Sequence, residues 1–491
     1  MMDAKEACGV FGVYAPGRPV AHLTFDGLYA LQHRGQESAG MAVSDGDLIT
    51  VMKDMGLVTT VFDERKLSGL RGHLAIGHTR YSTAGSSDWI NAQPVFRGVG
   101  RTGFGLAHNG NLTNTDALAE QANMLPGLVS SDSDLVAELL GQQFPPDLPE
   151  RTRAEHAADL EQALIEVLPK VEGAFSFVLM DADRIIGVRD PNGFRPLCLG
   201  RLDATDEFDQ GWVLASESPA LDVIGATFIR ELEPGEMVII DGKEIRSVRP
   251  FPNERLDPRL CIFEFVYFAR PDTTLYGNEV HGARRRMGQL LATQRPVDGD
   301  LVMGVPESGV PAAEGYALGS GIPYGQGLVK NRYIGRTFIA PTQAERANGV
   351  RRKLNPLREN IAGKRVIVVD DSIVRGTTTR AMVKMLREAG AAEIHLRISS
   401  PPFQWPCYYG IDTPDRTELL AAIKTLDEIV EYLDVDSLEY LTLEHLVQAI
   451  DAPGAGFCDA CLTGNYPVPV QVKVELTGRP TVTVAAGSAP A

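Results

Sequence analysis

The segment that contains Asp370 and Asp371 constrains the fold of this chain more than any other. The apolar run Val366–Val369 precedes the two carboxylates, and Gly376 with three threonines follows them. Such a run, followed by a helical pattern over Thr379–Ala389, is typical of a buried strand that leads into a helix. In open α/β sheets ligands bind beyond the carboxyl ends of the strands, and phosphates bind where a helix begins. We therefore expect a parallel sheet with an anion site at this edge.

The rest of the second half continues this alternation of strands and helices. The expected elements are, in order, Leu301–Val305, Val310–Gly319, Arg365–Val369, Thr379–Ala389 and Glu393–Ile398. This alternation favours a doubly wound α/β domain with a parallel sheet. Apolar residues at helical spacing over Glu418–Ile450 predict helices packed on this domain, with Cys407 beyond its last core strand. The stretch from about Gly478 is small and polar enough to be disordered.

A chain of 491 residues is too long for one hydrophobic core, since cores stop growing near roughly 250 to 300 residues. The first half shows short β-like runs interrupted by helical stretches over Leu135–Gln143 and Ala154–Leu168, which suggests sheets covered by helices. Three prolines between Pro250 and Pro258 suit a linker. The predicted divisions are a first domain over 8–251, a second over 252–470 and a tail over 471–491.

Charge and hydropathy limit the partners. With 64 acidic and 47 basic residues the net charge is -17, so the overall field repels nucleic acid. No apolar run approaches the roughly 20 residues that span a bilayer, and the residues before Cys8 do not form a secretory signal. We expect no nucleic-acid or membrane partner and a cytoplasmic protein. Six cysteines in such a chain are better explained by chemistry or metal than by a disulfide framework.

The loop after the carboxylates has the composition of a phosphate cradle. Gly376 lets the backbone approach closely, while Thr377 and Thr378 add hydroxyl donors to the amides of the loop. Asp370 and Asp371 accept hydrogen bonds only and suit ribose hydroxyls. A helix N-terminus with ordinary threonine caps is the plainer explanation, but it does not account for two adjacent carboxylates at the mouth of an apolar strand.

This run resembles the motif with which type I phosphoribosyltransferases bind phosphoribosylpyrophosphate (PRPP). The resemblance implies Mg²⁺ between the pyrophosphate and ribose oxygens of PRPP, with Asp370 and Asp371 beside the ion. It also makes Val305–Gly309 similar to the pyrophosphate loop of that family, with Ser308 near the metal. A simple strand-to-helix turn remains an alternative for this second segment.

A basic stretch lies between these two segments, over Lys330–Ile339 and Arg351–Leu354. Cations there can stabilise a departing pyrophosphate, although a solvated charged surface is the usual explanation. The stretch resembles the flexible catalytic loop of amidophosphoribosyltransferases, which closes over PRPP. By that resemblance Lys330, Tyr333 and Lys353 are lid contacts, and a closed lid excludes water.

Cys8 begins an apparent buried strand only seven residues into the chain. A lone cysteine there is usually a small buried hydrophobe. If residues 1–7 are removed, however, Cys8 carries both a thiol and an α-amino group, whose pKa of about 7.7 to 8.0 allows it to accept the thiol proton.

Three downstream segments favour the second interpretation of Cys8: Leu31–Gly40, Gly77–Thr83 and Ala107–Asn111. They resemble the class II glutamine amidotransferases, which implies a four-layer α/β/β/α N-terminal-nucleophile fold and glutaminase activity. Hydrolysing glutamine requires a clamp for its amino-acid head and donors for an oxyanion. Arg80 can pair with the α-carboxylate and Asp132 with the ammonium, although Asp134 competes for the second role.

Asn109 and Gly110 can supply the donors of an oxyanion hole through the amide side chain and the backbone N–H. His33, His78 and His108 are interpreted as structural partners, since Cys8 supplies its own amine.

Cys458 and Cys461 form a C-x-x-C pair, with Cys261 and Cys407 earlier in the second half. Four thiolates match a [4Fe-4S] cluster, structural zinc is the chemical rival, and a redox dithiol is possible for the pair alone. The four positions match the cluster ligands of the iron-sulfur branch of amidophosphoribosyltransferases. In that branch the residues before the nucleophile are a propeptide, removed autocatalytically. Cys198 has no such match and is predicted to lie in a core.

Together these resemblances imply that glutamine, PRPP and water are converted to 5-phosphoribosylamine, glutamate and pyrophosphate, the entry reaction of purine synthesis. They also imply a homotetramer inhibited by purine nucleotides. Two rivals remain. One is an amidotransferase with a sugar-phosphate isomerase domain, which the run from Asp370 to Thr378 disfavours. The other is a non-catalytic PRPP or redox sensor, which does not require Cys8 chemistry.

Overall fold

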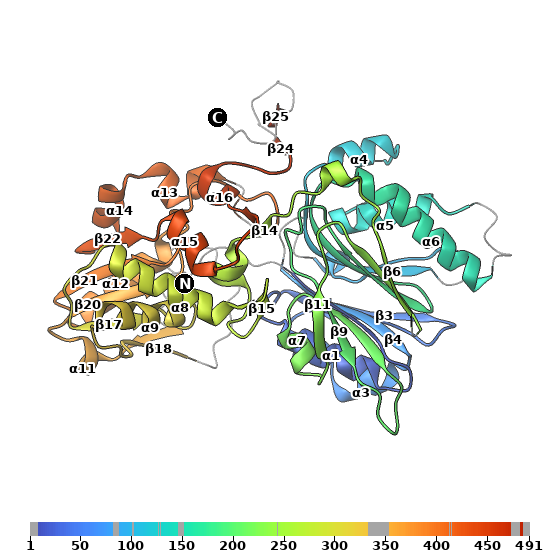
Figure 1. Ribbon diagram of the computed structural model, residues 1–491, viewed down its shortest axis with the longest axis horizontal. Coiled ribbons are helices and arrows are strands. Elements are labelled where there is room, and N and C mark those ends of the chain that lie inside the picture. Colours follow the sequence, from blue (N-terminus) through green and yellow to red (C-terminus); the bar gives the residue numbers. More distant parts are fainter. Residues whose placement is uncertain are drawn as a thin grey trace.

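The computed structural model describes residues 8–81, 88–100, 103–125, 127, 129–145, 152–242, 244–331, 353–411, 413, 415–472 and 482–484. Two domains lie side by side, with the N-terminal half on the right of Figure 1 and the C-terminal half on the left. Phe251 is still buried against Phe175 of the first domain. The linker predicted from the prolines therefore begins where this core ends.

The first domain consists of two antiparallel sheets. The seven-stranded sheet has the order β11 (Thr227–Glu231), β9 (Cys198–Leu202), β10 (Gly211–Ala215), β1 (Gly9–Tyr14), β4 (Leu74–Arg80), β2 (Ser38–Ser44) and β3 (Ile49–Met55). The six-stranded sheet has the order β13 (Glu244–Val248), β12 (Met237–Asp241), β8 (Arg184–Arg189), β7 (Gly173–Met180), β6 (Phe104–Leu112) and β5 (Val95–Arg97).

The two sheets pack face to face through an apolar core that includes Val10, Ile76 and Val178. Because successive side chains of a strand point to opposite faces, Phe11 and Val13 turn outward to a helical layer of α1 (Val20–Ala30), α2 (Val58–Val61), α3 (Glu64–Gly69) and α7 (Pro219–Asp222). The other outer layer is α4 (Thr115–Gln121), α5 (Asp132–Gln142) and α6 (Arg153–Val167). The four-layer α/β/β/α prediction is confirmed.

The second domain is built on a parallel sheet in the order β17 (Leu301–Gly304), β20 (Arg365–Asp370), β21 (Glu393–Ile398) and β22 (Ser437–Tyr440). One face packs on α8 (Val280–Gln294), α9 (Val310–Ser320) and α15 (Leu443–Ile450). The other packs on α12 (Thr377–Glu388) and α14 (Leu426–Leu433). The prediction of helices on both faces of a parallel sheet is confirmed.

Two expectations for this domain were wrong in detail. The stretch 418–450 is not all helical, because β22 pairs with β21 between α14 and α15. Cys407 therefore lies between the third and fourth strands rather than beyond the last. In the predicted tail, β24 (Val470–Val472) pairs with β25 (Val482–Val484); most of the remaining tail lies outside the described residues.

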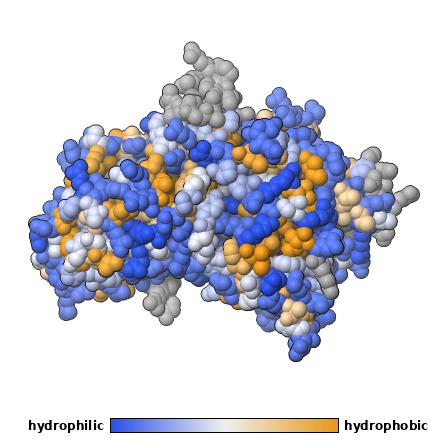
Figure 2. Space-filling view, viewed as in Figure 1, coloured by the Kyte–Doolittle hydropathy of each residue, from blue (hydrophilic) through white to orange (hydrophobic). Residues whose placement is uncertain are grey.

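Hydrophilic residues cover most of the face shown in Figure 2, with apolar patches scattered over both domains. Within the described residues, no helix combines the length and apolar character needed to cross a membrane.

Candidate functional sites

The predicted glutaminase residues gather at the end of the β1–β4 strand pair. Gly9 lies opposite Thr79, so the residues that flank this pair, Cys8 and Arg80, lie near one another. The Cys8 thiol is buried and donates to the carbonyl oxygen of Tyr81 at 3.4 Å. Burial raises the pKa of this thiol, the positive charge of Arg80 lowers it and the negative charge of Asp132 raises it. The charges of Arg80 and Asp132 therefore act on this thiol in opposite directions.

Asp132 is the first residue of α5, where backbone N–H groups favour a carboxylate. It accepts from Ser133 N at 2.8 Å and from Leu112 N at 3.3 Å, and His108 Nδ1 lies 3.6 Å away. Asp134 instead lies 3.4 Å from Arg97 Nη2. Asp132 raises the pKa of the Cys8 thiol, whereas Asp134 is turned toward Arg97.

Asn109 and Gly110 occupy neighbouring positions on β6. Asn109 is fully buried, and neither atom of its side-chain amide has a hydrogen-bond partner among the described residues. Gly110 has φ +144°, and a Cβ there would collide with the carbonyl of Ala174, so only glycine fits. A buried amide without partners is costly, and it suits a group that receives its partner from a ligand.

The three histidines of these segments have partners of their own. His78 Nε2 lies 2.9 Å from the carbonyl oxygen of His108, and burial lowers the pKa of His78 to about 3. His108 Nδ1 lies 3.1 Å from Ser133 Oγ, and His33 Nε2 lies 2.7 Å from Glu217 Oε1. This geometry agrees with their interpretation as structural partners.

The predicted PRPP residues lie at the carboxyl ends of two neighbouring parallel strands. Val305 N donates to Val369 O at 2.9 Å, which places the loop with Ser308 beside the end of β20. Asp370 and Asp371 are buried, and burial together with the neighbouring carboxylate raises the pKa of Asp370 to about 7. Asp371 Oδ1 and Ser308 Oγ are buried without a hydrogen-bond partner among the described residues.

Gly376 precedes α12 in the left-handed conformation, with φ +74°. Thr377 and Thr378 are the first two residues of the helix, so their backbone N–H groups belong to the first turn, which has no intrahelical acceptors. The loop and the carboxylates therefore meet at one edge of the sheet, as the sequence predicted.

Lys330 and Lys353 lie at the two ends of the basic stretch. β18 (Leu328–Lys330) pairs with β19 (Leu354–Pro356), and Asn331 N donates to Lys353 O at 2.8 Å. Lys330 Nζ lies 3.7 Å from Glu307 Oε2, next to Ser308. Tyr333 and the propeptide prediction for 1–7 lie outside the described residues.

The four predicted cluster cysteines come together at the edge of the second domain nearest the first. Cys261 pairs with Cys458 where β14 (Leu260–Cys261) meets β23 (Phe457–Cys458). Burial raises the pKa of Cys261, Cys458 and Cys461, and nearby thiols raise each of them further. Within the described part of the chain, no group of three or more His, Cys, Asp or Glu is spaced to hold a single metal ion.

The sequence did not reveal the charged cluster between the domains. Arg34 of the first domain bonds Glu217 and lies 2.6 Å from Glu264 Oε2 of the second, and Arg195 Nη1 lies 3.2 Å from Glu264 Oε1. All four side chains are buried. Thr273 Oγ1 also donates to Glu217, at 2.5 Å. The cluster joins the domains by ion pairs rather than by apolar contact alone.

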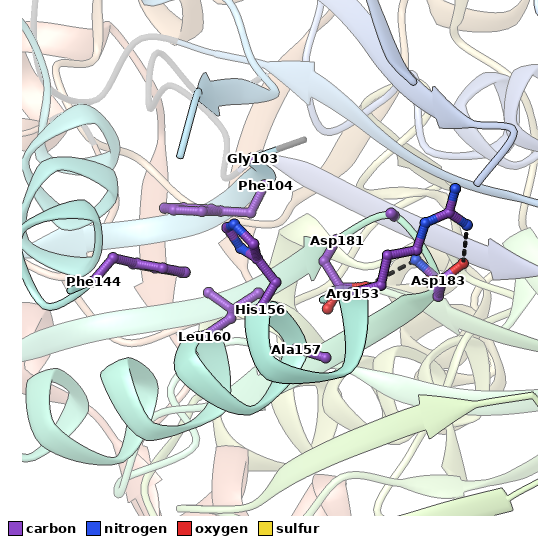
Figure 3. Close-up of a pocket in the computed structure, with 10 residues that line it drawn as sticks. Gly103, Phe104, Phe144, Arg153, His156, Ala157, Leu160, Asp181 and Asp183 are labelled. Atoms are coloured by element: carbon purple, nitrogen blue, oxygen red, sulfur yellow. Dashed lines mark hydrogen bonds and ion pairs between the residues drawn. The ribbon is translucent and has the colours of Figure 1, made fainter. Parts of the chain in front are cut away.

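Two hollows lie away from these residues. One, of about 20 Å³, lies between α6 and β6, with His156 beside the stacked rings of Phe104 and Phe144 (Figure 3). It has room for about one water molecule. The other, of about 730 Å³ and lined by Asp298, Gly319 and Arg365 among others, lies at the amino ends of β17 and β20, opposite Asp370. Neither coincides with the predicted sites.

Comparison with known families gives two matches. Residues 78–223 match the glutamine amidotransferase domain family, and residues 277–399 match the phosphoribosyl transferase domain family. The fold and the two sites thus define a glutamine amidotransferase joined to a phosphoribosyltransferase.

Relatives span nearly the whole chain. The amidophosphoribosyltransferase of Mycobacterium tuberculosis (strain ATCC 25618 / H37Rv) is 53% identical over 479 residues, covering 94% of this chain and 87% of its own length. That of Bacillus subtilis (strain 168) is 44% identical, with 95% of each chain covered. A solved structure of the Bacillus subtilis glutamine PRPP amidotransferase complexed with ADP and GMP has a TM-score of 0.83 and 43% identity, and covers 94% of this chain and 97% of that one.

The chain belongs to the amidophosphoribosyltransferase family. It is a transferase that uses glutamine and PRPP in the first step of purine biosynthesis, which gives 5-phosphoribosylamine, glutamate and pyrophosphate.

Proposed function

We propose that Cys8 attacks the side-chain amide of glutamine and that the released ammonia replaces the pyrophosphate of PRPP at the second site. The observation that carries this assignment is the unpartnered, buried amide of Asn109 close to the strand pair that ends at Cys8 and Arg80. A buried polar group without a partner is suited to an oxyanion that forms only during the reaction.

In the first site, Arg80 binds the α-carboxylate of glutamine and Asp132 binds its ammonium. Asn109 Nδ2 and the N–H of Gly110 donate to the oxyanion of the tetrahedral intermediate. Burial keeps the Cys8 thiol protonated, so it requires a nearby base. Removal of residues 1–7 would supply that base as the α-amino group of Cys8 itself.

In the second site, Asp370 and Asp371 hold the ribose hydroxyls, and the loop of Gly376, Thr377 and Thr378 holds the 5-phosphate. Lys330 is close enough to the Ser308 loop to reach the pyrophosphate. Tyr333 and Lys353 complete the lid.

Mg²⁺ fits this site, because Asp371 Oδ1 and Ser308 Oγ are buried oxygens without partners among the described residues, and Mg²⁺ prefers oxygen ligands. Asp370, Asp371 and Ser308 would hold the ion. When bound, it would neutralise the negative charge of the pyrophosphate.

We propose that Cys261, Cys407, Cys458 and Cys461 would hold a [4Fe-4S] cluster rather than zinc, because the four positions match the ligands of the iron-sulfur branch of the family. Cys261 and Cys458 lie side by side where β14 meets β23, and all four residues are free thiols, the ligands that such clusters take. All six cysteines of the chain are free thiols, which favours a reducing compartment such as the cytoplasm.

The proposed cluster is tested on protein purified without oxygen, which should be brown and contain about four iron atoms per chain. Colourless, active protein with stoichiometric zinc would rule out the cluster.

Two further proposals concern regulation and assembly. The Bacillus subtilis relative was solved with ADP and GMP, and purine nucleotides are proposed to inhibit this chain too. A homotetramer is proposed from the family resemblance. Inhibition assays with purine nucleotides, and light scattering for the mass of the assembly, test these two points.

Glutamate release from glutamine, measured with and without PRPP, tests the assignment of the two sites. We expect glutamine hydrolysis that PRPP stimulates, together with pyrophosphate release. A protein that binds PRPP but releases no glutamate would be the sensor considered above, and intact-protein mass spectrometry would show whether residues 1–7 are absent from the active form.

A further inference from the structure

The guanidinium of Arg195 is fully buried at the boundary between the domains. Nε and Nη2 donate to the carbonyl oxygen of Tyr409 at 3.2 and 2.8 Å, and Nη1 lies 3.2 Å from Glu264 Oε1. Arg195 belongs to the first domain, whereas both partners belong to the second. Burying a cation is costly unless it is paired and hydrogen-bonded, so its position calls for a physical reason.

Arg195 is linked to Cys407 through Tyr409. The carbonyl oxygen of Tyr409 accepts from the guanidinium, and the N–H of the same residue donates to Cys407 Sγ. The single negative charge of Glu264 is shared between two arginines, because its other carboxylate oxygen lies 2.6 Å from Arg34 Nη2.

The backbone around Arg195 is also tied to these cysteines. Cys261 N donates to Phe194 O at 3.1 Å, and the Phe194 ring stacks on Tyr409 with ring centroids 4.5 Å apart. Tyr409 N in turn donates to Cys407 Sγ at 3.4 Å. A two-residue segment of the first domain thus holds both the strand that carries Cys261 and the loop that carries Cys407.

We propose that Arg195 is a positioning residue of the cysteine cluster site, supplied by the glutaminase domain to compensate the negative charge of the thiolate-bound cluster. This inference rests on the [4Fe-4S] cluster proposed above. With four thiolate ligands an oxidised cubane cluster is an anion, and reduction by one electron adds further negative charge. Net charge and hydrogen bonds around the sulfurs set the reduction potential of such clusters. A buried cation beside them raises that potential, and the Glu264 carboxylate lowers it.

The test uses the full-length protein purified without oxygen. The midpoint potential of the cluster is measured by dithionite titration with mediator dyes, followed by the electron paramagnetic resonance signal of the reduced cluster. We expect Arg195→Gln to shift the midpoint to lower potential, Glu264→Gln to shift it to higher potential, and Arg195→Lys to remain near wild type. Arg195→Gln should also lose iron in air several-fold faster than wild type.

Arg201→Gln is the matched control, because Arg201 is a half-exposed arginine of the same domain that pairs with Asp203 at 2.7 Å. The midpoint potential should shift in opposite directions in Arg195→Gln and Glu264→Gln, whereas a general loosening of the fold would shift both in the same direction. If Arg195→Gln does not fold, the upward shift expected for Glu264→Gln still tests the inference. The inference would be overturned if Arg195→Gln contained as much iron as wild type and had the same midpoint potential and the same rate of iron loss in air as Arg201→Gln. Wild-type protein without iron would overturn the proposed cluster itself.

Discussion

The two predicted substrate sites differ in how they hold a buried carboxylate. Burial tends to raise the pKa of Asp132, but His108 and the backbone donors Leu112 and Ser133 outweigh it, so its pKa is lowered. Burial raises the pKa of Asp370 to about 7, and the adjacent Asp371 contributes to the rise. Donors around Asp132 stabilise its charge, whereas at the second site two adjacent buried carboxylates repel one another.

This difference suggests how each site is completed. Asp132 is already charged and held in place, so the glutamine site is complete once its substrate arrives. The Mg²⁺ proposed above would add a positive charge beside the Asp370–Asp371 pair when PRPP binds. The first site is therefore preorganised by protein contacts, and the second depends on its ligand.

The largest effect expected is the separation of the two activities. Cys8→Ala should reduce glutamine-dependent synthesis by about 10⁴-fold or more, because it removes the nucleophile. PRPP turnover with high ammonium at alkaline pH should remain near wild type, since free ammonia bypasses the first site. Pyrophosphate release measures both reactions, and Cys198→Ala is the control for a buried thiol outside the site. A folded Cys8→Ala variant that loses both reactions equally would contradict two separate sites.

The second prediction concerns the stability that the buried charged cluster between the two domains provides. Glu217→Gln should lower the free energy of unfolding by about 3–5 kcal/mol at pH 7, because it leaves Arg34 buried with one partner fewer. The exposed Glu207→Gln is the control. Arg34 and His33 hold the pKa of Glu217 below its usual 4.5 against burial, so its stabilising contribution is present above pH 4.5 and is lost as the pH falls. In urea denaturation, the difference in free energy of unfolding between Glu217→Gln and wild type should become smaller below that pH. A difference that does not change with pH would contradict this account.

A smaller effect compares the two carboxylate environments directly. Asp132→Asn should cost about 1–3 kcal/mol of stability, because its backbone donors lose part of their acceptor. Asp371→Asn should leave stability unchanged or improve it, since it removes the repulsion between two adjacent buried carboxylates, yet PRPP turnover should fall with glutamine and with ammonia. Thermal unfolding without ligands measures the change in stability of Asp132→Asn and of Asp371→Asn. Equal losses of stability in the two variants would mean that the two carboxylate environments do not differ.

Much of this architecture could be predicted from the sequence because the motifs are local. The apolar run before Asp370, the turn glycine Gly376 and the helix after it are contiguous, so their arrangement at one sheet edge follows from chain order. The strand β22 was missed because Ser437–Tyr440 is short and lies between two amphipathic helices.

The buried arginines could not be predicted for a different reason. Arg34 and Glu264 lie 230 positions apart in the sequence, and a charged residue gives no local sign that a distant partner will bury it. The choice between Asp132 and Asp134 depended on side-chain direction at the start of α5, which composition does not determine. The unpartnered amide of Asn109 likewise depends on what surrounds it in space.

The most direct test of the central claim is covalent labelling of the first site with a diazoketone analogue of glutamine, which alkylates an activated thiol. Peptide mass spectrometry of the labelled protein should place one adduct on a chain that begins at Cys8, with glutamine-dependent synthesis lost and ammonia-dependent PRPP turnover retained. An adduct on another cysteine, a labelled chain that still carries residues 1–7, or the loss of both activities would contradict the account.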